Sequence, residues 1–203
     1  MAVLFAGAVV VGASLAEPTA RAASREPACT PPRTRTVARS TTARLFLRRG
    51  QLAACVIADG RIEDISAYTT GTLHGSLAAY PGVSYKGDGI DEVDSLAIYV
   101  PSLRRRKILR VVEVPVQSYS AREVASLALL GDGTVAWITC PANRRDEPCA
   151  SRGLRRVMLE PLGGPVRILA RSPSIRARGL RFSDSGRVLR WREGSRVRHT
   201  RIR

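Results

Sequence analysis

Histidine, lysine and long apolar runs are all scarce in this chain of 203 residues. His74 and His199 are its two histidines, and no serine lies in a Gly-x-Ser-x-Gly or Ser-x-x-Lys motif. Gly163-Gly164 has the character of a hairpin turn and precedes no helix that could bind phosphate at its N-terminus. After residue 22, no stretch approaches the roughly 20 apolar residues of a membrane-spanning helix. The sequence therefore predicts neither a catalytic residue nor a transmembrane helix in the mature chain.

The N-terminal segment has the character of a secretion signal. Residues 1–16 read MAVLFAGAVVVGASLA and carry no charged side chain. This apolar run, followed by small residues, is typical of a signal peptide, although the usual basic residues before the run are missing. We expect a signal peptide over 1–22, a flexible arm over 23–34 and one domain over 35–203. A disordered apolar tail is the alternative for the first segment.

The four cysteines have the number and spacing of disulfide partners rather than of a zinc site. They are Cys29, Cys55, Cys140 and Cys149, and no pair has the Cys-x-x-Cys spacing of zinc ligands. Cys140 and Cys149 bracket the polar loop PANRRDEP, so proximity favours a bond between them and leaves Cys29 to pair with Cys55. Four cysteines permit three connectivities in all. Disulfides predict a secreted or extracytoplasmic protein associated with the cell envelope.

Positive charge is concentrated at the C-terminal end. The net charge is +16, of which residues 151–203 carry +12 and residues 1–150 carry +4. Such a segment is either a solvated face or a surface that attracts polyanions, for example an anionic envelope polymer. It contains only two aromatic residues, Phe182 and Trp191, which the repeat described below places in the core. We therefore expect no specific nucleic-acid binding, because single-strand readers stack bases on exposed aromatic residues.

A short sequence frame, glycine followed by aliphatic and aromatic residues, recurs along the chain. Its copies are GQLAAC (50–55), GSLAAY (75–80), GTVAW (133–137) and GRVLRW (186–191), and the third copy places its tryptophan one residue early. Each copy predicts a strand that leaves a hairpin turn at its glycine. The segments before three of the copies, at 45–47, 127–130 and 180–182, are the predicted incoming strands.

A second repeat adds another hairpin to each unit. Residues 157–169 align without gaps on residues 97–109, and each segment reads as strand, polar turn and strand. A proline after a strand is tolerated because it removes no interior ladder bond. Two hairpins in roughly fifty residues predict a four-stranded antiparallel blade.

We expect an all-β fold of β-propeller-like repeats, about four units with incomplete terminal blades. The predicted third strand is residues 61–65 in the first unit and residues 196–202 in the last unit. Neither of these two units shows a clear fourth strand. The strand Arg35–Arg39 could close the propeller by supplying a missing edge. A β-sandwich and an open blade stack are the alternatives. In an open stack, the arginines of the last strand would protect its edge.

The repeat segments resemble a known building style. VASLALLGDGTVAWITC with RRVMLEPLGGPVRILA, and RGLRFSDSGRVLRWREG near the end, resemble secreted bacterial β-propeller-like repeats of the TolB/WD40-like kind. The resemblance covers residues 35–203, but the Trp-Asp dipeptide of WD40 blades is absent, since Ile138 follows Trp137 and Arg192 follows Trp191. It implies architecture and no particular activity.

One acidic cluster remains as a metal candidate. Asp88, Asp91 and Asp94 lie in the stretch KGDGIDEVD and could bind calcium, although the spacing does not fit an EF-hand and a solvated loop explains it equally well. The sequence otherwise predicts no cofactor. We expect a non-catalytic binding or scaffold module whose partner is an anionic envelope polymer or another protein. An extracytoplasmic hydrolase that uses His74 and these carboxylates, and a degenerate propeller relic, are the competing hypotheses.

Overall fold

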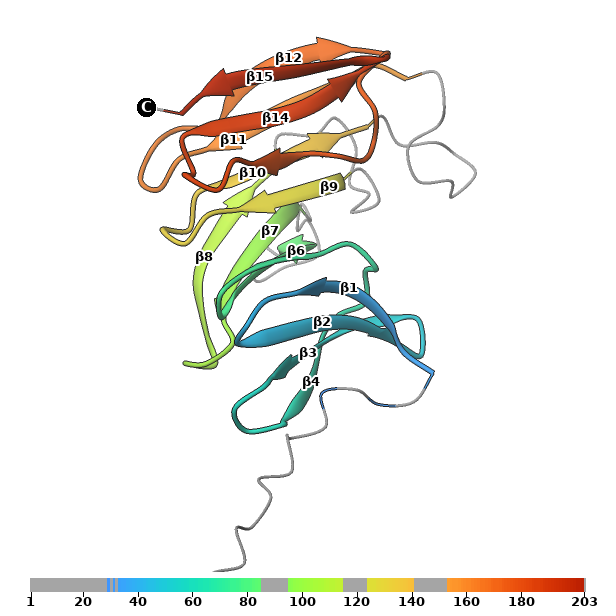
Figure 1. Ribbon diagram of the computed structural model, residues 1–203, viewed down its shortest axis with the longest axis vertical. Helices are drawn as coiled ribbons and strands as arrows, with labels where there is room; N and C mark the ends of the chain where they lie inside the picture. The colour runs from blue at the N-terminus through green and yellow to red at the C-terminus, as the bar shows by residue number, and fades with distance from the viewer. Residues whose placement is uncertain are drawn as a thin grey trace, which may run out of the picture.

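The described part of the protein is an all-β stack of sheets. The structure, a computed structural model, describes Cys29, Pro31 and residues 33–84, 95–114, 124–140 and 153–202. These residues form strands and turns and contain no helix. Four antiparallel sheets follow one another in chain order, and Figure 1 shows them piled from the first, in blue, to the fourth, in red.

Three of the sheets have four strands and the last has three. The first contains β1 (Arg35–Arg39), β2 (Ala43–Arg48), β3 (Gln51–Val56) and β4 (Ile62–Ser66). The second contains β5 (Thr72–His74), β6 (Leu77–Ser84), β7 (Ser95–Ser102) and β8 (Lys107–Glu113). The third contains β9 (Val124–Leu129), β10 (Val135–Thr139), β11 (Arg155–Glu160) and β12 (Arg167–Ser172). The fourth contains β13 (Arg181–Phe182), β14 (Val188–Glu193) and β15 (Arg196–Arg201).

The sheets are joined along their first strands, and the array is open. The strand β5 contacts both β1 and β9, and β9 contacts β13, so the first strands of successive sheets lie along one side of the stack. Within the described residues, no strand of the first sheet pairs with the fourth, and the two sheets lie at opposite ends in Figure 1. The described strands therefore form the open blade stack, and closure into a propeller is not observed.

The predicted closing role of Arg35–Arg39 is wrong. This segment is β1, and it pairs antiparallel with β2, with Arg35 opposite Leu47. The turn at 40–42 makes that pairing local, and the Ser40 hydroxyl accepts bonds from the N–H groups of Thr42 (3.2 Å) and Ala43 (3.0 Å). A pairing with the far end of the chain would close a much longer loop and cost more chain entropy.

The first copy of the glycine frame lies in a different hairpin from the others. Gly50 ends the β2–β3 turn, whereas Gly75, Gly133 and Gly186 precede the second strands β6, β10 and β14. This difference in position explains the short spacing between the first two copies. The predicted third strand at 61–65 is instead the fourth strand β4, which begins at Ile62, so the first unit is complete where the sequence predicted an incomplete one.

The third copy of the glycine frame places its tryptophan one residue early because the turn before its strand is shorter. Leu129 pairs with Val135 in the third sheet and Phe182 with Leu189 in the fourth, so the turn is 130–134 in one and the longer 183–188 in the other. Trp137 and Trp191 therefore occupy equivalent places, and each packs toward the preceding sheet.

The second repeat is confirmed as the hairpin of third and fourth strands in two sheets. Residues 97–109 lie in β7 and β8, and residues 157–169 lie in β11 and β12. Pro161 follows β11 as expected, but Pro101 lies within β7. It is accommodated there because the register of β7 and β8 shifts between Val100 and Pro101.

The core consists of apolar layers between neighbouring sheets. The strand β10 is buried along its whole length, with Val135 and Trp137 in the layer against the second sheet and Ala136 and Ile138 in the layer against the fourth. A strand buried on both faces lacks the apolar–polar alternation of a half-exposed one. Burial of this kind stabilises the fold by roughly 25 cal/mol per Å² of apolar surface.

Polar bridges connect the sheets across these layers. The Ser40 hydroxyl donates to the carbonyl of Gly75 (2.7 Å), which ties the first sheet to the second. Arg110 of β8 pairs with the Glu160 carboxylate of β11 and donates to the carbonyls of Gly133 (3.2 Å) and Pro161 (3.0 Å). One arginine therefore satisfies three acceptors of the next sheet.

A disulfide holds Cys29 against the outer side of the first sheet. Cys29 is bonded to Cys55 of β3, as predicted, and these residues form a buried cluster with Phe46 and Ala53. Arg44 also packs on this cluster. Its guanidinium lies 5.4 Å from the Phe46 ring centroid and donates to the Cys29 carbonyl (2.5 Å). Cys29 thus covers apolar residues of the first sheet that no other described sheet covers.

Several sequence predictions fall outside the described residues. They are the signal peptide over 1–22, most of the arm over 23–34, and the carboxylates Asp88, Asp91 and Asp94. Cys140 is disulfide-bonded, and its predicted partner Cys149 is also outside the described residues. In the described ranges, no helix is long and apolar enough to cross a membrane.

Candidate anion-binding site

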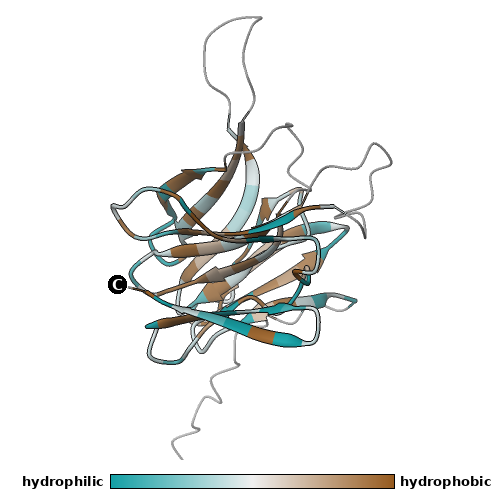
Figure 2. Ribbon diagram, turned by 90° about the horizontal axis from the view of Figure 1, so that it is seen from above, coloured by the Kyte–Doolittle hydropathy of each residue, from teal (hydrophilic) through white to brown (hydrophobic). Residues whose placement is uncertain are grey.

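The side of the fourth sheet that faces away from the third sheet, here called the terminal face, is basic. Along β14, Leu189 and Trp191 are buried toward the third sheet, whereas Arg190 and Arg192 are exposed on the opposite side. Successive strand residues point to opposite faces, so this alternation assigns the arginines to the terminal face. Figure 2 shows hydrophilic and hydrophobic residues alternating along strands of the stack.

A bulged loop borders an open hollow on this face. Ile175 pairs with Glu193, and Arg181 pairs with Arg190, so the chain between them follows the edge of β14. Between these two pairings, residues 176–179 loop away from β14. The hollow has a volume of ≈ 580 Å³ and is lined by Arg176, Ala177, Arg178, Gly179, Arg181, Arg190, Trp191, Arg192 and Val197.

Backbone bonds fix the start of the loop, and a glycine ends it. The Arg176 N–H donates to the Arg192 carbonyl (2.9 Å), and the Gly194 N–H donates to the Ser174 carbonyl (2.8 Å). Gly179 has φ +97°, a conformation that side-chain-bearing residues rarely adopt. The loop therefore has a defined path that holds its arginines beside β14.

The arginines of the hollow have no acidic partner among the described residues. The acidic side chain nearest in sequence, Glu193, is occupied elsewhere: its pKa is lowered by a hydrogen bond from Ser172 and by its bond with Arg198. Two other ion pairs, Arg61–Glu63 and Arg110–Glu160, lie outside the fourth sheet. The terminal face therefore has positive charge that no described carboxylate neutralises.

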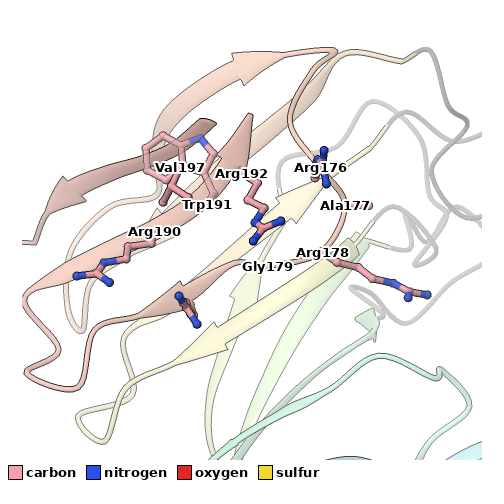
Figure 3. A pocket seen from close by; sticks show the side chains of 9 residues that line it. Arg176, Ala177, Arg178, Gly179, Arg190, Trp191, Arg192 and Val197 are labelled. Carbon is pink, nitrogen blue, oxygen red and sulfur yellow. The ribbon is translucent and has the colours of Figure 1, made fainter. Parts of the chain in front are cut away.

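The arginine side chains spread over the hollow instead of converging on one point. In Figure 3, Arg192 extends from β14 toward the Arg176–Gly179 loop, while Arg190 and Arg178 lie on either side. A single phosphate is best held by convergent donors, whereas an extended polyanion contacts a spread of cations. The arrangement fits the second kind of ligand.

Trp191 is among the residues that line the hollow, although its side chain is buried toward the third sheet. It is only 6% exposed, and its indole nitrogen has no hydrogen-bond acceptor within the described structure. The indole nitrogen of Trp137, in the equivalent place of the third sheet, also has no acceptor in the described structure. The missing acceptor is therefore a property of the repeat rather than of the hollow.

His74 lies in a second hollow, which is separate from the terminal face. This hollow has a volume of ≈ 510 Å³ and lies among the first strands β5, β9 and β13. His74 is exposed and packs so closely on Gly131 that a Cβ there would lie 2.9 Å from its Nε2. The other histidine, His199, lies on β15 of the fourth sheet. Ser183, Asp184 and Ser185 line the same hollow, but within the described residues no hydrogen bond joins them to His74.

The calcium prediction cannot be placed on the structure, because Asp88, Asp91 and Asp94 are outside the described residues. Within the part of the chain that is described, no three histidine, cysteine or acidic side chains lie close enough to hold a metal ion.

Comparisons with known proteins do not identify a family for this chain. No known protein family matches this chain. Searches of curated proteins and of solved structures also find no match. The architecture and the surface chemistry of the chain therefore carry any functional argument.

The hollow was not predicted from the sequence, although one signal was present. Residues 187–193 read RVLRWRE, in which arginine and apolar residues alternate. That alternation indicates a strand with one charged face. The position of the 176–179 loop over this face depends on tertiary pairing and has no comparable sequence signal.

Proposed function

We propose that this protein is an extracytoplasmic, non-catalytic binding module that uses the terminal face to hold an anionic polymer of the cell envelope. We further propose that its sheets are propeller-like repeats of the TolB/WD40-like kind. The stack of blade-like sheets, each with strands in consecutive order, supports this relationship. The disulfide between Cys29 and Cys55 is consistent with an oxidising compartment.

The observation that carries the proposal is the set of arginines around the hollow. A solvated protein surface normally mixes charges of both signs, because a large field of one sign destabilises the compact state. The terminal face instead gathers five arginines, and none of them belongs to an ion pair of the described chain. They are Arg176, Arg178, Arg181, Arg190 and Arg192. A polyanion that lies across the face would relieve their mutual repulsion.

Binding to linear polyphosphate, a simple polyanion, tests this function. The double variant Arg190→Gln/Arg192→Gln removes two charges from the terminal face. The double variant Arg104→Gln/Arg105→Gln removes the same charge from the exposed β7–β8 turn. Since exposed ion pairs contribute about 0.2–1 kcal/mol each, we expect the first variant to bind about fivefold more weakly at low salt and the second to bind like the wild type.

The salt dependence supplies the second readout. Added salt screens exposed charges, so wild-type affinity should fall as salt rises, and the fall should be shallower for the Arg190/Arg192 variant than for the control. Equal losses in the two variants would show that net charge alone drives binding and would refute a defined site on the terminal face.

A further inference from the structure

The strand β15 is an edge with no neighbour on one side in the described chain. In the first three sheets, the third strand pairs on both sides, for example β11 with β10 and with β12. In the fourth sheet, the third strand β15 pairs with β14 alone, and its side chains are nearly all exposed. Its free edge therefore offers a row of backbone donors and acceptors.

The register identifies which backbone groups face outward. The Ile202 N–H donates to the Arg187 carbonyl (2.8 Å), so Ile202 directs its backbone groups toward β14. In an antiparallel pair this direction alternates along the strand, so Thr200, Arg198 and Arg196 also point toward β14. The N–H and C=O groups of Val197, His199 and Arg201 consequently point away from the sheet.

The charge of the edge restricts what can pair with it. The residues of β15 are Arg196, Val197, Arg198, His199, Thr200 and Arg201, none of which is acidic. Arg198 is paired with Glu193 (2.9 Å), whereas Arg196 and Arg201 have no acidic partner in the described chain. Like charges directly opposite in a sheet destabilise the pair, so the same edge of a second copy is a poor neighbour and an acidic strand is a good one.

We propose that the free edge of β15 binds a strand of an acidic polypeptide by antiparallel β-addition. The outward groups of Val197, His199 and Arg201 bond the backbone of the added strand, and its carboxylates lie beside the arginines of β15. The fourth strands of the other sheets are five residues (β4), seven residues (β8) and six residues (β12) long, which sets the length of the partner segment. This site uses backbone groups at an edge and is distinct from the polymer site on the terminal face.

A matched pair of variants tests the backbone contact. His199→Pro removes one outward N–H and leaves the bonds between β14 and β15 intact, and proline is tolerated on an edge strand. His199→Ala removes the same side chain and keeps the N–H. The probe is a fluorescent heptapeptide of alternating glutamate and threonine, with glutamine in place of glutamate as the uncharged control.

We expect the wild type and His199→Ala to bind the acidic peptide alike, His199→Pro to bind it about fivefold more weakly, and the glutamine peptide to bind poorly. Equal affinity of the two variants would overturn strand addition. Thermal unfolding of both variants checks that the proline leaves the fold intact.

Two N-methylated peptides decide the matter if His199→Pro is destabilised. One carries N-methyl groups at odd positions and the other at even positions, so their charges are equal. Strand addition to the wild-type protein requires one to bind more weakly than the other, because only alternate amides face β15. Equal binding would mean simple charge attraction and would overturn the proposal. Because the Arg190/Arg192 variant keeps the edge intact, loss of polymer binding with retained peptide binding separates the two sites.

Discussion

Replacing Arg110 with methionine tests whether the second and third sheets are held together by the polar bridge between them. The side chains of Arg110 and Glu160 are 15% and 14% exposed, so the pair is largely removed from water. Arg110→Met leaves Glu160 as an unpaired carboxylate and deprives the Gly133 and Pro161 carbonyls of a donor. Breaking one partner of a buried pair costs 3–5 kcal/mol, and the residual exposure here favours the lower end, about 3 kcal/mol.

Urea unfolding of the oxidised protein, followed by tryptophan fluorescence, measures this loss, because Trp137 is buried at the same layer. The double variant Arg110→Met/Glu160→Met removes both charges, so its loss should be roughly half that of the single variant. Arg105→Met, an exposed arginine of the β7–β8 turn, should change the unfolding free energy by less than about 0.5 kcal/mol. An Arg110→Met protein as stable as the Arg105→Met control would refute the assignment of the bridge as a stabilising contact.

Three further perturbations probe other features. Cys29→Ser/Cys55→Ser opens a loop with a sequence separation of 26, for which chain entropy predicts a loss of about 3.5 kcal/mol, measured by urea unfolding; an unchanged midpoint would contradict it. The pKa of Tyr80 is raised by burial and by the nearby Tyr99, so the fold favours the neutral phenol. Its contribution is present below pH 10.0 and is lost as pH rises toward the folded pKa; Tyr80→Phe should flatten this alkaline decline in thermal unfolding. The lowered pKa of Glu193 has the opposite consequence: its contribution is present above pH 4.5 and is lost as pH falls through the folded value, and Glu193→Gln should remove that acid dependence.

The strands and hairpins were predictable because each hairpin carries its own local signal. A turn glycine before an alternating or apolar run marks β6, β10 and β14 without reference to the rest of the chain. The second repeat identified the paired third and fourth strands for the same reason. The predicted bond between Cys29 and Cys55 is confirmed, since the count of cysteines left few choices.

The grouping of hairpins into sheets was less predictable. The glycine frame occurs at any hairpin and does not identify which strands the hairpin joins. The sequence therefore gave no sign that the Gly50 copy lies between the second and third strands of its sheet. The sequence also could not decide between closure and an open stack, because that difference depends on how the first and last sheets are placed, for which a hairpin carries no local signal. In the structure, β1 pairs locally with β2 across the short turn at 40–42, and closure is not observed among the described strands.

The terminal face was likewise predictable only in part. The alternation in β14 predicts a charged face, but the side of the sheet that remains uncovered depends on the position of the third sheet. The charge excess of residues 151–203 could equally have been distributed over both faces. Only packing separates Leu189 and Trp191 on one side from Arg190 and Arg192 on the other.

The bond between Cys29 and Cys55 also determines how the fold bears mechanical load. Tension applied through residues that precede Cys29 enters the fold at Cys55, in an interior strand that is paired on both sides, and bypasses β1. The strand β3 is held by ladders to both β2 and β4, whereas β1 is held by one ladder to β2. Reduction would transfer the load to β1, so the thiol–disulfide state of this one pair determines which strand of the first sheet carries the load.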